Sequence, residues 1–149
     1  MEFAPATINI LDFEALKYDV AKAYFEDSAN VLQVSKGGKV NIDIVNDQLS
    51  GMVGLPNVYG LLTKDSDETE WRLRYVGQRK AKGIRQRLRE HLEYCSPKTG
   101  SQLKNVRIAL NQGCEVGIKL LVINHDELRH FFESHLINDI KGVDWNTQK

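Results

Sequence analysis

The chain has 149 residues, of which 42% are hydrophobic, so it is long enough to bury one ordinary core. Its 20 basic and 20 acidic residues give a formal net charge of zero, and no apolar run approaches the length needed to span a membrane. The first residues show neither the basic nor the apolar segment of a secretory signal. We therefore expect one soluble, cytoplasmic protein that does not associate with a membrane.

Residues 1–55 are expected to form an extension made of a helix and a strand. Residues 11–26 predict an amphipathic helix, since apolar side chains recur at helical spacing at Phe13, Leu16, Val20 and Tyr24. The segment "VNIDIV", residues 40–45, alternates as a strand does. Residues 49–56 then become rich in glycine and proline, which places a domain boundary before residue 56.

Residues 56–149 predict a compact α+β core. The expected elements are two strands joined by a polar hairpin, two helices, a third strand and a third helix, at residues 58–62, 71–77, 83–95, 101–113, 115–123 and 125–140. We expect the last helix to begin with a capping box formed by Asn124 and Glu127.

A local run of positive charge interrupts the neutral balance. Between Trp71 and Arg89 there are eight basic residues and no acidic one. Such a run is usually a solvated face, but clustered Lys and Arg are also what binds the phosphates of nucleic acids. Our candidates for nucleic-acid contact are Arg72, Arg74, Arg79, Lys80, Lys82 and Arg85.

Two polar residues of the first core helix lie on its apolar side. A step of about 100° per residue puts His91 inside the buried stripe and Arg87 at its edge, whereas Arg85 points away. The stripe itself consists of Ile84, Leu88, Leu92 and Cys95. A histidine in such a stripe is more often a satisfied core residue than a catalytic one. An arginine on the same side is harder to explain, so we expect both groups to face the sheet that carries Tyr59 and Tyr75.

The last helix carries a carboxylate at the border of its apolar face. Glu133 lies off the stripe of Leu128, Phe131, Phe132 and Leu136, so it is either a surface partner of Arg129 or a metal ligand. In the same helix, "HFFESH" places His130 and His135 five residues apart, or about 140° around the axis, so they cannot share one zinc ion. Cys95 and Cys114 form no C-x-x-C pair; we expect them to be reduced, with a disulfide left open.

The order of "NVY", "YVG", "RLREHL", a helix glutamate and a late asparagine resembles the GIY-YIG nuclease superfamily. That family includes DNA repair subunits, homing endonucleases and restriction enzymes. The resemblance covers about residues 56–146, and the ordered set is specific although each triplet alone is weak. It implies a small three-stranded antiparallel sheet flanked by helices, in the order strand, strand, helix, helix, strand, helix, which is the order expected above.

The family motif can be carried over position by position. The catalytic set implied by the resemblance is Tyr59, Tyr75, Arg87, His91, Glu133 and Asn146, with Gly77 closing the second triplet. The chain departs from the family where Asn57 replaces the first glycine and Val76 replaces isoleucine. The segment before the arginine is also slightly long, which leaves Arg85 as a rival to Arg87.

The resemblance implies an endonuclease that hydrolyses DNA with Mg²⁺ or Mn²⁺. Glu133 would hold the ion, which takes oxygen ligands and keeps several waters, and Arg87 would brace the scissile phosphate. Tyr59 is the candidate base, Tyr75 its partner or a phosphate ligand, and His91 a proton relay or positioning group. Asn146 would orient the last segment by hydrogen bonding.

A free tyrosine, with a pKa of about 10, is a poor base at neutral pH. We therefore expect the metal, Arg87 and the Lys80/Lys82 stretch to lower the pKa of this site. Two other classes of function stay open: a nucleic-acid-binding module that does not cut, and an interaction scaffold that uses the extension. RNA as a substrate and a homodimer that cuts both strands stay open as well.

Overall fold

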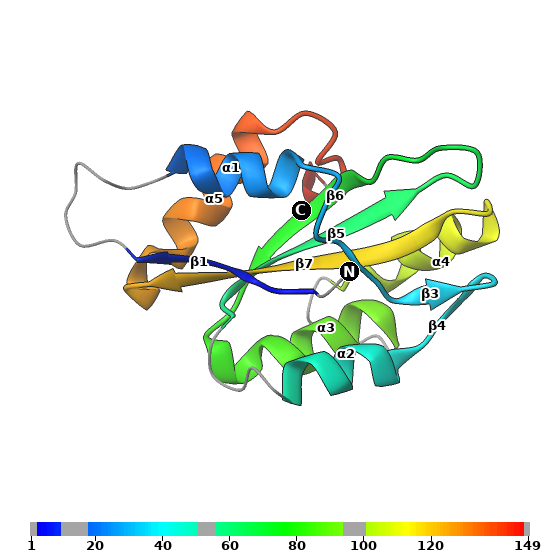
Figure 1. The fold of residues 1–149 in the computed structure, drawn as a ribbon, viewed down its shortest axis with the longest axis horizontal. Helices are drawn as coiled ribbons and strands as arrows, with labels where there is room; N and C mark the ends of the chain where they lie inside the picture. The colour runs from blue at the N-terminus through cyan, green and yellow to red at the C-terminus, as the bar shows by residue number, and fades with distance from the viewer. Residues whose placement is uncertain (1–2, 10–17, 51–55, 94–100, 148–149) are drawn as a thin grey trace.

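The computed structural model describes residues 3–9, 18–50, 56–93 and 101–147, and these form a mixed sheet with helices on both faces (Figure 1). The fold is α+β, as the sequence predicts. No helix in these ranges is long and apolar enough to cross a membrane. The strands and helices predicted after residue 56 are all present, with bounds that differ by a few residues.

The sheet is larger than the sequence indicates. Its central strands are β5 (Val58–Lys64), β6 (Arg72–Gln78) and β7 (Glu115–Asn124), and β5 pairs antiparallel with both others. The expectation of a three-stranded antiparallel sheet is nevertheless wrong, because β1 (Ala6–Asn9) joins β7 in parallel and β2 (Leu32–Gln33) joins it antiparallel. β7 has ten residues, three more than β5. Its second edge, which β5 does not pair with, is covered by β1 and β2 from the N-terminal part of the chain.

The segment predicted as a strand at residues 40–45 is mostly helix. A short hairpin of β3 (Ser35–Lys36) and β4 (Lys39–Val40) ends there, and α2 (Ile42–Ser50) begins directly after it. The side chain of Asn41 accepts a hydrogen bond from the backbone N–H of Asp43, as an N-cap does, at 3.0 Å. Val45 and Leu49, one turn apart, are the buried residues of α2, so helical spacing and not alternation decides its buried face.

Helices cover both faces of the sheet and create two cores (Figure 1). α1 (Tyr18–Glu26) and α5 (Arg129–Asp139) pack on one face, where the buried residues include Phe25, Leu73, Phe132 and Leu136. α2, α3 (Ile84–Leu92) and α4 (Leu103–Asn111) pack on the other face, with Tyr59, Leu61, Leu88 and Val106 among the buried residues. Of the helix predicted at residues 11–26, only the part from residue 18 lies within the described residues.

A buried lysine fastens α1 to the sheet. Lys119, in the middle of β7, is completely buried, and its ammonium donates hydrogen bonds to the backbone carbonyls of Tyr24 and Asp27 at the end of α1. These carbonyls are among those that a helix leaves without an internal partner, so the cation satisfies them. Burial lowers the pKa of Lys119 to about 8.

The last helix begins later than predicted. Asn124 is the final residue of β7, and a 3-10 turn (Asp126–Leu128) precedes α5, which starts at Arg129 without a side-chain cap. The expected capping box is therefore wrong. Asp126 instead accepts hydrogen bonds from Arg129 and from Asn57 of the first triplet, and these bonds tie the start of α5 to β5.

Candidate functional site

Tyr59 lies on the face of the sheet that α3 covers, and its ring crosses directly over Gly77. The two residues are paired across β5 and β6. A Cβ atom added to Gly77 would lie 2.3 Å from both Cζ and Oη of Tyr59, far inside van der Waals contact. The glycine of "YVG" is thus required by the position of the tyrosine in "NVY".

An irregularity in β6 brings Tyr75 to the same face. The pairing with β5 shifts between Leu61, which opposes Tyr75, and Leu62, which opposes Leu73, so Arg74 is an extra residue. In a regular strand Leu73 and Tyr75 would share a face. Leu73 instead belongs to the core under α1 and α5, while Tyr75 packs against the core under α3. The bulge therefore re-aims Tyr75.

Helix α3 supplies the two polar groups that the sequence predicts. His91 is completely buried, and its Nε2 lies 2.8 Å from Oη of Tyr59; its ring also contacts the ring of Tyr75 at 5.1 Å between centroids. Arg87 is only 7% exposed and pairs with Glu90. Both groups face the sheet, so this prediction is confirmed. Cys95, expected in the same stripe, lies outside the described residues.

The two candidate arginines occupy different environments. Arg85 is exposed, and its Nε donates to Oδ1 of Asn46 on α2 at 3.1 Å. The positive charge of Arg87 acts on Tyr59 and lowers the pKa of its phenol. Of the two residues, the structure brings Arg87 to the tyrosine cluster.

The hydrogen bonds of His91 fix which ring nitrogen carries its proton. The backbone N–H of Gln102, just before α4, donates to Nδ1 at 2.9 Å. An N–H can only donate, so Nδ1 must be unprotonated. Burial, with the positive charges of Arg87 and Arg79, lowers the pKa of His91 to about 3, so the ring is neutral at pH 7. The proton then lies on Nε2, which donates to Tyr59.

Tyr59 is a neutral phenol in this environment. Burial, followed by the charge of Tyr75, raises its pKa well above the ordinary value, while Arg87 acts to lower it. The expectation that neighbouring positive charge would lower the pKa of this site is correct for the contribution of Arg87. Among the described residues, however, burial outweighs it.

Asn146 holds the free edge of β6 next to the bulge. Its Oδ1 accepts a hydrogen bond from the backbone N–H of Val76 at 2.8 Å, and its Nδ2 donates to the carbonyl of the same residue at 2.9 Å. The amide thereby replaces a neighbouring strand. Two residues earlier, Asp144 accepts a hydrogen bond from Arg74 at 2.9 Å. The expectation that Asn146 orients the last segment by hydrogen bonding is confirmed.

Glu133 lies on α5 and is half-buried. Arg129, the surface partner considered for it, donates to Gln78 of β6 and to Asp126. These bonds hold α5 along the end of β6. Within the described ranges no group of three or more His, Cys, Asp or Glu is arranged to hold a metal ion. Any ion at Glu133 would therefore depend on water and substrate for most of its ligands.

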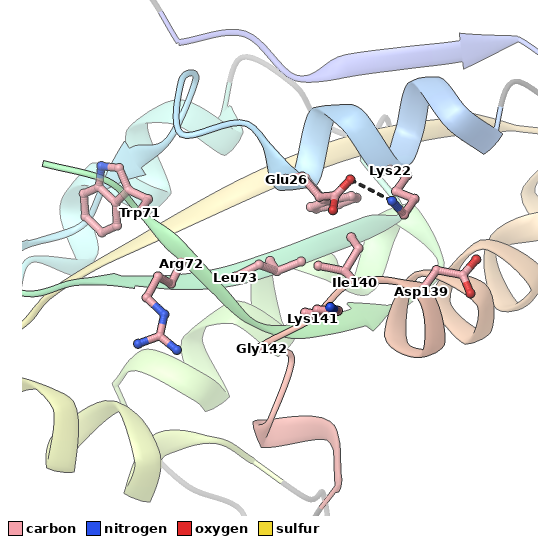
Figure 2. Close-up of a pocket in the computed structure, with 10 residues that line it drawn as sticks. Lys22, Glu26, Trp71, Arg72, Leu73, Asp139, Ile140, Lys141 and Gly142 are labelled. Atoms are coloured by element: carbon pink, nitrogen blue, oxygen red, sulfur yellow. Dashed lines mark hydrogen bonds and ion pairs between the residues drawn. The ribbon is translucent and has the colours of Figure 1, made fainter.

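The basic residues are divided between the two ends of β6. Arg72, at the start of β6, is among the residues that line a hollow of about 500 Å³ between α1, β6 and residues 139–142, but its guanidinium is directed away from α1 (Figure 2). Lys80 and Lys82 line a different hollow of about 410 Å³, beside Asn57 and His125. Arg74 is held by Thr63 and Asp144, and Arg79 is exposed.

Sequence reasoning missed the contribution of Gln102, because it acts through a backbone N–H and no side-chain pattern could reveal it. It also missed the extra residue in β6. Comparisons of the chain with protein-family models, curated proteins and solved structures find no match.

Proposed function

We propose that the protein is a metal-dependent endonuclease of the GIY-YIG type, with DNA as its substrate. The observation that carries the proposal is the polar cluster on the α3 face, where His91 hydrogen-bonds Tyr59 in contact with Tyr75 and beside Arg87. Buried polar groups are costly unless they are satisfied or used, and they gather at functional sites. Four residues singled out by one ordered motif meet in this cluster.

The fold is compatible with the proposed family. The order β6–β5–β7 puts the first strand of the motif at the centre of three antiparallel strands, with α3, α4 and α5 following in the implied order. β1, β2, α1 and α2 would then be additions of this chain to that core. They lie against β7 and α3, so they would stabilise the elements that carry the site.

The proposed chemistry needs positive charge at the phosphate more than it needs a strong acid. The guanidinium of Arg87 lies beside Tyr59, and its planar, permanent positive charge would brace a phosphate at the cluster. A bound Mg²⁺ or Mn²⁺ would polarise the phosphoryl oxygen and supply a more acidic water. The donor set fits such an ion, since Mg²⁺ is commonly held by one carboxylate together with water and substrate phosphate. Glu133 is our candidate for that carboxylate.

We propose that DNA binds over Lys80 and Lys82, at the end of the sheet. Both line the hollow beside Asn57, two residues before Tyr59. Arg72 begins β6 whereas Lys80 and Lys82 follow its last residue, so we propose that Arg72 does not belong to the same DNA contact. A phosphate backbone lying over Lys80 and Lys82 would pass the end of β5 from which Tyr59 projects.

The test is cleavage of supercoiled plasmid in Mg²⁺, in Mn²⁺ and in EDTA. We expect metal-dependent nicking by the wild type and loss of nicking in Glu133→Gln. The matched control is Glu127→Gln, which removes an exposed carboxylate near the start of the same helix and should cut normally. Circular dichroism establishes that both variants fold.

The products also distinguish the remaining possibilities. Nicked circles indicate a single acting site, whereas direct linear product indicates a pair of sites such as a homodimer provides. Binding of DNA without cleavage in either metal would refute the nuclease and favour the module that does not cut. A structured RNA in place of the plasmid tests the other substrate.

A further inference from the structure

The hairpin of β3 and β4 turns through the sequence "KGGK", in which two lysines lie side by side. Lys36 is paired directly with Lys39, and Ser35 with Val40. Residues directly opposite in an antiparallel pair share a face, whereas successive residues of one strand point to opposite faces. Ser35 is buried and Val40 packs against the core under α3. Both lysines therefore face away from the core.

The two lysines repel each other within the hairpin. Like charges directly opposite each other destabilise an antiparallel pair, whereas a glutamate opposite a lysine would stabilise it. Both lysines are exposed, and within the residues that the structure describes neither forms an ion pair. The pair therefore works against folding, which points to a ligand of negative charge.

The hairpin presents the two lysines on a support that is held at its base. Oγ of Ser35 accepts a hydrogen bond from the N–H of Val116 at 2.7 Å, and the N–H of Val34 donates to the carbonyl of Val116 at 2.9 Å. At the tip, Gly37 and Gly38 have φ values of 61° and 80°, as a tight two-residue turn requires. A Cβ at either glycine would meet no atom within 4 Å. The backbone between the lysines is thus open to a ligand.

The hairpin lies at the start of β7, which it contacts through Ser35 (Figure 1). The hollow lined by Lys80 and Lys82 lies at the other end of β7, beside Asn124. A strand rises by about 3.3 Å per residue, so the two basic sites are about 25–30 Å apart. Both border the α3 face, because Val40 packs on its core and the segment with Lys80 and Lys82 leads directly into α3. A straight duplex covers this distance in about eight to nine base pairs.

We propose that the β3–β4 hairpin binds the phosphate backbone of the same DNA duplex that lies over Lys80 and Lys82, through Lys36 and Lys39. The inference rests on the proposed DNA substrate, but it does not require cleavage. Phosphate contacts fix the position of a duplex without reading its sequence. The hairpin would therefore set the orientation of the DNA across the α3 face, and the N-terminal extension would take part in binding.

The first test is acetylation of lysine by acetic anhydride, located by peptide mass spectrometry, in EDTA so that no cleavage occurs. A duplex of about 20 base pairs is long enough to reach both basic sites. With one duplex bound per protein, we expect Lys36, Lys39, Lys80 and Lys82 to react several times more slowly than in the free protein. The exposed Lys141, which follows Ile140 of the core under α1 and α5, should react unchanged.

Three results of this experiment would overturn the proposal. The first is protection of Lys80 and Lys82 alone, and the second is no binding of the duplex. The third is protection of Lys36 and Lys39 by polyglutamate and not by the duplex, which would indicate an acidic protein as the partner.

Substitutions test the role of the charge. Replacing Lys36 and Lys39 with glutamine should reduce the slope of the logarithm of the DNA-binding constant against the logarithm of salt concentration by about 1.8, the value for two phosphate contacts. Replacing both with arginine should preserve the slope. An unchanged slope in the glutamine variant would refute the contact.

A single charge reversal separates binding from stability. Lys39→Glu removes the repulsion in the hairpin, so it should raise the urea midpoint and yet weaken DNA binding by about tenfold or more. Lys141→Glu makes the same change of charge beside the other core and should weaken binding by less than about twofold. Equal binding by the two variants would refute the proposal. A lower urea midpoint in Lys39→Glu would give that lysine a structural role and overturn the proposal as well.

The outcome is separable from that of the proposed nuclease. Glu133→Gln should bind the duplex in EDTA and protect the hairpin lysines as the wild type does. Protection of Lys36 and Lys39 without plasmid nicking would leave the DNA contact in place and remove only the catalytic function. Nicking by a protein whose Lys36 and Lys39 stay fully reactive in the complex would support the nuclease and overturn the hairpin contact.

Discussion

Replacing Gly77 with alanine tests the arrangement of the site with a single methyl group. The added Cβ would stand 2.3 Å from Cζ and Oη of Tyr59, whereas ordinary contacts begin at 3.4 Å. The ring must therefore move by about 1 Å. The backbones of the two residues are paired across β5 and β6, so the strand cannot easily retreat. The movement has to come from the tyrosine side chain.

The expected cost has two parts. Forcing an extra carbon into a filled core typically costs about 1–3 kcal/mol of unfolding free energy. Displacing the phenol by about 1 Å would also break its 2.8 Å contact with His91, and misplacement by this distance can reduce an enzymatic rate by about a hundredfold. We therefore expect a folded but less stable protein with a large loss of nicking activity.

Urea denaturation followed by circular dichroism measures the loss of stability, and plasmid nicking measures the loss of activity. The matched control is Gly83→Ala, since a Cβ at Gly83 meets no atom within 4 Å. This control should be as stable as the wild type and equally active. If Gly77→Ala were also indistinguishable from the wild type in both assays, the ring of Tyr59 could not lie where we describe it.

Three further changes have expected outcomes. Asn146→Asp would place a carboxylate oxygen next to the carbonyl oxygen of Val76, where the amide of Asn146 now donates. The free energy of unfolding in urea should fall by about 1–3 kcal/mol or more, and the loss should be smaller at a pH low enough to protonate the new carboxylate. Because the pKa of His91 falls from about 6.5 in the unfolded chain to about 3, its contribution to stability is complete above pH 6.5. That contribution is lost as the pH falls toward 3, by up to about 1.4 kcal/mol per pH unit. Urea midpoints measured at a series of pH values should show this loss of stability in the wild type and not in His91→Gln. Replacing both Lys80 and Lys82 with alanine should reduce the slope of the logarithm of the DNA-binding constant against the logarithm of salt concentration by the amount expected for about two phosphate contacts. Arg72→Ala should leave this slope unchanged.

Periodicity predicted the parts of the site that depend on one element alone. The helical repeat of Ile84, Leu88 and Leu92 was sufficient to place Arg87 and His91 on the buried side of α3, because the geometry of a helix is local. The strand repeat was not sufficient for β6. A single extra residue, Arg74, reverses the alternation, and a sequence carries no mark of where two strands slip in register.

The features that sequence could not supply are those that depend on distant contacts. Asn41 converts an alternating segment into a helix by capping it, and β7 acquires two partners from the first 33 residues. Charges near Tyr59 can be counted from the sequence, but its burial cannot. For this reason the sequence predicted the lowering by Arg87 but not the larger effect of burial, which raises the pKa of Tyr59.

Lys119 bears on whether residues 56–149 can fold alone. Its ammonium donates to the carbonyls of Tyr24 and Asp27 at the end of α1, which lie outside that segment. A chain that began at residue 56 would keep the charge in the middle of β7 and lose the acceptors, and it would open the far edge of the same strand to other molecules. The extension is thus part of the physical unit that folds, even if the motif residues all lie beyond it. Transfer of the motif segment to another protein would have to replace Lys119 with an apolar residue first.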